Sequence, residues 1–96
     1  MSAHVFMFRL TPEGAKNPAK IAELRKQGLK KIEELGGKAV AAYLLLGPKD
    51  ALIIVEGLDD KKAMAFAASR AASGLLTTET YAAVPADEAI EMLSKT

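Results

Sequence analysis

The chain contains no cysteine, only one histidine and few aromatic residues. Without cysteine it can form no disulfide bond, no thiolate metal site and no cysteine nucleophile. A single histidine without thiolate partners also argues against a transition-metal site. Long hydrophobic runs are missing too, since no apolar stretch approaches the roughly 20 residues that span a bilayer. These absences predict a protein with no bound metal and no membrane-spanning segment.

An excess of charge of one sign is also missing. Thirteen basic and 12 acidic residues leave a net charge of +1, which gives no field that would attract nucleic acid or an anionic membrane. The basic residues between Lys16 and Lys31 share their predicted helix with Glu23, Glu33 and Glu34 and are not interleaved with aromatic residues, as expected of a solvated helix face. No phosphate-binding glycine loop or dinucleotide fingerprint is present, so we expect no cofactor. Residues 1–10 lack the features of a signal peptide, which favours a cytoplasmic location.

The remaining composition is that of a globular protein. Ninety-six residues, half of them apolar, predict one domain over residues 1–96. Ala39–Leu46 and Ala51–Glu56 are nearly continuous apolar runs on either side of a Gly-Pro turn signal, which predicts a hairpin buried on both faces. The helices of so short a chain can cover one face of a sheet. We therefore expect a second copy of the chain to cover the other.

The order of the predicted elements indicates the fold class. Strands are expected at Val5–Leu10 and Leu75–Val84 and helices at Ala19–Leu35 and Asp60–Ser73, with an amphipathic tail after Pro85. With the hairpin strands this gives strand-helix-strand-strand-helix-strand, the split arrangement of the ferredoxin-like fold. The prediction is an α+β protein with an antiparallel four-stranded sheet and both helices on one face. Within that sheet we expect the first and third strands to be parallel neighbours.

Four short motifs occur in order along nearly the whole chain, from about Phe6 to Leu93. They are Thr11-Pro12-Glu13-Gly14, Leu46-Gly47-x-x-Asp50, Glu56-x-x-Asp59-Asp60 and Thr78-Glu79-Thr80. In order and spacing the chain resembles the GYD-domain family. The resemblance implies a small ferredoxin-like domain, similar to the dimeric α/β-barrel proteins, with no established activity. The chain departs from the family pattern at Lys49, where an aromatic residue is usual before Asp50.

Side-chain alternation along the strands suggests a cluster of charges. Arg9, Glu56 and Glu79 are expected on the face that the helices leave open, with their side chains converging. Two carboxylates beside one arginine leave a surplus negative charge, so one glutamate could hold a proton near neutral pH and serve as a general acid or base. Tyr43 or Tyr81 could supply a hydroxyl group nearby. The simpler interpretation is a salt-bridge network that fixes strand register and subunit geometry.

The other polar candidates have structural interpretations. His4 is a candidate general base, or an ordinary residue at the end of a strand. Asp50 is expected to cap the hairpin turn, and Asp59-Asp60 to cap the second long helix.

Three functions remain open. The first is a homo-oligomeric module of the α/β-barrel type that binds at most a small molecule between subunits, with Tyr43, Arg9 and Glu56 as candidate ligand-binding residues. The second, suggested by the dimeric α/β-barrel resemblance, is a cofactor-free oxygenase or isomerase acting on a small apolar substrate. Arg9, Glu56, Glu79 and His4 are its candidate catalytic residues. The third is a regulatory domain that binds a ligand or a protein partner.

Overall fold

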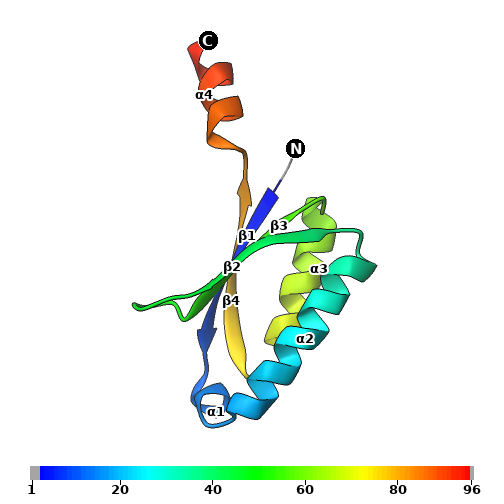
Figure 1. Cartoon of the computed structure of the whole chain (residues 1–96), viewed down its shortest axis with the longest axis vertical. Helices are drawn as coiled ribbons and strands as arrows, with labels where there is room; N and C mark the ends of the chain where they lie inside the picture. The colour runs from blue at the N-terminus through cyan, green and yellow to red at the C-terminus, as the bar shows by residue number, and fades with distance from the viewer. Residues whose placement is uncertain (1–2, 96) are drawn as a thin grey trace.

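The computed structural model of the chain describes residues 3–95 and has four strands, two long helices and two shorter ones (Figure 1). In chain order the elements are β1 (Ala3–Leu10), α1 (Pro12–Ala15), α2 (Pro18–Glu34), β2 (Lys38–Leu44), β3 (Ala51–Glu56), α3 (Asp60–Ala71), β4 (Leu76–Ala83) and α4 (Ala86–Ser94). The predicted strands and long helices are all present, with bounds that differ by a few residues. The Thr11-Pro12-Glu13-Gly14 motif forms the short helix α1, capped by Thr11, whose side chain accepts a hydrogen bond from the Gly14 N–H.

The strands form one antiparallel sheet in the order β2-β3-β1-β4. The predicted α+β class and antiparallel ferredoxin-like arrangement are confirmed. The expectation that the first and third strands run parallel was wrong, because β1 pairs with β3 in antiparallel register from Ala3↔Glu56 to Phe8↔Ala51. The crossover through α2 makes β2 run in the same direction as β1. The hairpin then reverses the chain, so β3 enters the gap between them in the opposite direction.

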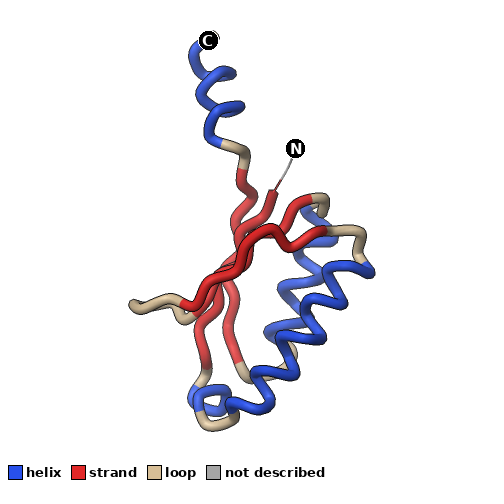
Figure 2. Tube along the Cα trace, viewed as in Figure 1, coloured by secondary structure: helices blue, strands red, loops and turns tan. Residues whose placement is uncertain are grey.

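Helices α2 and α3 lie on the same side of the sheet (Figure 2). The hydrophobic core packs between these helices and the sheet. Phe6 of β1 and Phe66 of α3 meet edge to face at its centre, with ring centroids 4.8 Å apart. One side of α2 faces the sheet, with Leu24, Gly28 and Ile32 buried. The other buried members of the core are Ile53, Val55, Leu58 and Ala63.

The short helix α1 ties the end of β1 to the start of β4. The N–H of Thr11 donates to the carbonyl of Leu75 over 3.0 Å, and its hydroxyl donates to the carbonyl of Gly74 over 2.8 Å. Gly14 is buried against the same backbone, so that a Cβ at this position would overlap the carbonyl oxygen of Leu75. A residue without a side chain is therefore required at this corner.

In the described part of the chain, the opposite face of the sheet carries no helix, and α4 does not fold back onto it (Figure 1). Instead α4 projects beyond the ends of β1 and β4, which gives the described chain extents of 50 × 30 × 18 Å. No helix within residues 3–95 combines the length and the apolar character needed to cross a membrane. The hairpin tip is also uncovered, with Leu44 91% exposed. In the single chain, the hairpin is therefore not buried on both faces.

Candidate functional site

The helix-free face of the sheet is apolar at its centre. Val5 lies opposite Ile54 and Met7 opposite Leu52, on the side of β1 and β3 that faces away from the buried Phe6. All four side chains are half-buried. Below, this set of four residues is called the open face.

The three charges predicted to converge on this side do not meet. Arg9 lies opposite Thr77 at the carboxyl end of β1, whereas Glu56 lies opposite Ala3 at the other end of that strand. Within residues 3–95 no ion pair joins Arg9 to Glu56 or to Glu79. The prediction that Glu56 lies beside Arg9 was wrong because it assumed that β1 and β3 run parallel. In the antiparallel pair, carboxyl ends lie at opposite ends of the sheet.

Glu79 instead binds a residue that the sequence analysis did not place near it. Its Oε1 accepts from Lys49 Nζ over 2.5 Å and its Oε2 from the hydroxyl of Tyr81 over 2.7 Å. The hydrogen bond from Lys49 is the main reason that the pKa of Glu79 lies below its usual value, and the one from Tyr81 is the second. Glu79 is therefore ionised near neutral pH. The proton-holding role suggested by a surplus of negative charge does not suit it.

The hydrogen bond also affects Tyr81. Because its hydroxyl donates to a carboxylate, the pKa of Tyr81 is raised above its usual value. Lys49 comes from the loop between β2 and β3, so the strand alternation that placed Glu79 could not place its partner. The one available signal was the unusual lysine at this position of the family pattern.

His4 is buried, with 3% of its surface exposed, and lies on the helix-covered side of β1. Its Nε2 is 2.8 Å from Oδ1 of Asp60, at the start of α3. Its Nδ1 is buried and has no hydrogen-bond partner in the described part of the chain. Neither sequence interpretation anticipated this burial, because His4 precedes the strand predicted from Val5 onward.

The capping predictions were correct for one of the two sites. Asp59 caps α3, accepting from the N–H of Lys62 over 2.8 Å. Asp50 does not cap its own turn; its Oδ2 accepts from the N–H of Leu10 over 2.7 Å and thus joins the hairpin to β1. Among residues 3–95, no three histidine, aspartate or glutamate side chains are grouped so that they could hold a metal ion.

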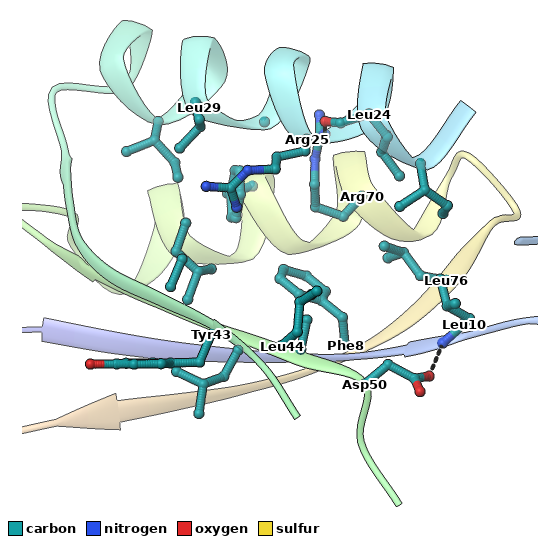
Figure 3. A pocket seen from close by; sticks show the side chains of 18 residues that line it. Phe8, Leu10, Leu24, Arg25, Leu29, Tyr43, Leu44, Asp50, Arg70 and Leu76 are labelled. Carbon is teal, nitrogen blue, oxygen red and sulfur yellow. Dashed lines mark hydrogen bonds between the residues drawn. The ribbon is translucent and has the colours of Figure 1, made fainter. Parts of the chain in front are cut away.

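A cavity of about 400 Å³ lies between the helix layer and the sheet (Figure 3). Its walls are mostly apolar and include Phe8, Leu24, Ile53 and Phe66. The strand positions beneath α2 include two small residues, Ala42 and Ala51, which leave this space unfilled. The cavity could not be predicted from the sequence, because its volume depends on how far the helices lie from the sheet.

Charged and polar side chains also line the cavity. Arg25 of α2, Arg70 of α3 and Asp50 contribute charge (Figure 3). Tyr43 borders the cavity from β2, but it pairs with Leu52 of the open face, so its side chain lies on the side of the sheet away from the helices. Of the three residues predicted to bind a ligand, only Tyr43 lines this space, whereas Arg9 and Glu56 do not.

Comparison with known proteins agrees with the motifs. The family model described as GYD domain matches residues 4–93, nearly the whole chain. No curated protein matches the chain.

Proposed function

The chain belongs to the GYD-domain family, and we propose that it acts as a homo-oligomeric module in which the open faces of two copies pack together. One observation carries the proposal. Within residues 3–95, two apolar surfaces of the chain, the open face and the projecting helix α4, are not covered by other elements and do not reach each other (Figure 1). A second copy supplies a partner for both surfaces.

Magnitudes indicate that both surfaces are needed. Fully burying a side chain such as Ile or Met stabilises association by roughly 1.5–3 kcal/mol. The four residues of the open face are already half-buried, so each gains less than this. Association costs on the order of 4–15 kcal/mol in lost freedom. The stabilisation from burying the open face alone does not clearly exceed that cost. Further apolar surface must therefore be buried in the contact.

Helix α4 provides this additional surface. Ile90 and Leu93 lie three residues apart, and therefore on one side of the helix, and both are mostly exposed. Val84, in the segment leading to α4, is also exposed. Docking α4 on a second copy would bury these side chains. It would also extend the contact beyond the sheet.

The enzyme alternative has no comparable support. It depended on Arg9, Glu56 and Glu79 acting together, and the antiparallel pairing of β1 with β3 separates Glu56 from Arg9. A binding module therefore fits the geometry better than a catalyst.

The test is a charged substitution at the centre of the open face. Ile54 pairs with Val5 on one side and Ala41 on the other, so Ile54→Lys places a charge in the middle of the contact. We expect sedimentation velocity at micromolar concentration to show an oligomer for the wild type and a monomer for Ile54→Lys. Ala22→Lys, on the exposed side of α2, is the matched control and should remain assembled.

Circular dichroism should show that Ile54→Lys retains its fold. A monomeric wild type at this concentration would contradict the proposal, and so would a folded Ile54→Lys variant that remains assembled.

A further inference from the structure

The cavity between the helix layer and the sheet has the size and lining of a ligand site. Its volume of about 400 Å³ falls at the lower end of the range of roughly 300–1,000 Å³ found for small-molecule pockets. Phe8, Ile53 and Phe66 give it apolar walls, and such walls suit a hydrocarbon or aromatic body. We propose that this cavity binds a small apolar monocarboxylate, whose body enters between the layers and whose carboxylate pairs with Arg25.

The charges that line the cavity favour an anion. Only one of the three charged residues is acidic, and the carboxylate of that residue, Asp50, already accepts a hydrogen bond from the backbone of Leu10. Within residues 3–95, neither Arg25 nor Arg70 forms an ion pair with a carboxylate. The cavity therefore holds two guanidinium groups with no carboxylate paired to either.

Arg70 is held in place by contacts that do not neutralise it. It is 8% exposed, and its Nη1 donates to the carbonyl of Leu24 over 2.7 Å. Its Nε donates to the hydroxyl of Ser69, and its guanidinium lies 5.4 Å from the ring centroid of Phe66. A fixed cation beside an apolar cavity makes the interior favourable for negative charge and unfavourable for positive charge.

Arg25 is the residue suited to bind the carboxylate. It belongs to the exposed part of α2, and its side chain extends from that helix toward the sheet, over the cavity (Figure 3). A guanidinium can bind a carboxylate through two parallel hydrogen bonds. Since Arg70 is engaged with Leu24 and Ser69, Arg25 is the cation free to reorient toward a ligand.

The experiment is a calorimetric titration of the full chain with three probes that share one hydrocarbon chain. These are octanoate, octan-1-ol and octylammonium, which are anionic, neutral and cationic. We expect octanoate to bind about tenfold or more tightly than octanol, as a charged hydrogen bond would give, and octylammonium to bind most weakly. Equal affinities for octanoate and octanol, or no binding of octanoate, would overturn the proposal.

Two variants of α2 test the role of Arg25. Arg25→Gln should weaken octanoate binding by about tenfold and leave octanol binding unchanged. Lys26→Gln makes the same change of charge at the next residue, which does not line the cavity, and should leave both affinities unchanged. An equal loss in the two variants would indicate general surface attraction and would overturn the assignment.

A third variant tests where octanoate binds. Ala42 lines the cavity and is exposed, so Ala42→Phe should fill part of the space at little cost to the fold and weaken octanoate binding. In the wild type, amide chemical-shift changes on octanoate addition should centre on residues that line the cavity. Chemical-shift changes centred on other residues would overturn the assignment of the binding site to this cavity.

The inference does not depend on self-association, because every lining residue belongs to one chain. The folded Ile54→Lys variant should therefore bind octanoate as the wild type does, even if it is a monomer. Failure of the oligomer and failure of the ligand site can thus be told apart.

Discussion

At the scale of single residues, the contact of Lys49, Glu79 and Tyr81 joins the hairpin loop to the edge strand β4. All three groups have exposed or half-exposed side chains, so the pair is of the kind that contributes little to stability on its own. Its pH dependence has a definite sign. The pKa of Glu79 is lowered by the hydrogen bond from Lys49 first and from Tyr81 second, so the folded state favours the ionised form.

A carboxyl with a lowered folded pKa stabilises the fold above its ordinary pKa, about 4.3 for glutamate, and this stabilisation is lost as the pH falls through the folded value. We therefore expect Glu79→Gln to be less stable than the wild type at neutral pH, with the difference vanishing in acid. Urea unfolding over a series of pH values measures it. Lys49→Gln removes the hydrogen bond that is the largest cause of the lowered pKa of Glu79. In this background, the loss of stability caused by Glu79→Gln at neutral pH should be smaller. A difference that persists unchanged in strong acid would contradict this account.

Some residue positions could not be predicted from local patterns. The face of each strand follows from alternation, which puts Val5, Met7, Leu52 and Ile54 on the side of the sheet away from Phe6. The burial of His4 did not follow, because it depends on Asp60 reaching across from another element over 2.8 Å. Contacts made by loop residues or across elements leave no periodic signal in the chain.

At the scale of elements, the hydrophobic periods were enough to predict each strand and long helix. The direction of β3 was predicted wrongly, as parallel to β1, and that error also placed Glu56 beside Arg9. The order of elements does contain the correct answer, because a strand inserted after a hairpin must run against the first strand. The cavity could not be obtained in this way. It depends on the separation of α2 from Ala42 and Ala51 in the sheet.

The packing of α1 against Leu75, just before β4, gives a prediction at this scale. Gly14→Ala would bring a methyl group into the carbonyl of Leu75, and backbone cannot move aside as a flexible side chain can. We expect a loss of roughly 1–3 kcal/mol in the free energy of unfolding, the usual cost of overpacking. Urea denaturation measures the loss. The exposed neighbour Ala15→Ser is the control, and an equal effect at the two positions would contradict the close approach.

At the scale of the whole molecule, the described chain is more extended than its length requires. Its radius of gyration is 14.5 Å, whereas a compact chain of this size has roughly 12.5 Å. The projecting helix α4 accounts for the long axis (Figure 1). An amphipathic helix held away from its own body is marginal in water and needs a surface to pack on.

A substitution in α4 should therefore affect assembly more than folding. We expect Ile90→Ser to raise the Kd of self-association by about tenfold, or 1.4 kcal/mol, because Ile90 is mostly exposed in the single chain. The thermal stability of the monomer, measured in the Ile54→Lys background, should be unchanged. Sedimentation equilibrium gives the Kd, with the exposed Asp87→Asn as the control. An unchanged Kd for Ile90→Ser would show that α4 takes no part.

The projection of α4 also limits how copies can be arranged. If each of two chains docks its α4 on the other about a two-fold axis, both helices are buried and assembly stops at a dimer. If each chain instead lends its helix to the next, every addition leaves one unsatisfied end, and a filament grows until the rotation between neighbours closes it into a ring. The angle at which the chain leaves β4 through Val84 and Pro85 therefore selects between closed and open-ended symmetry.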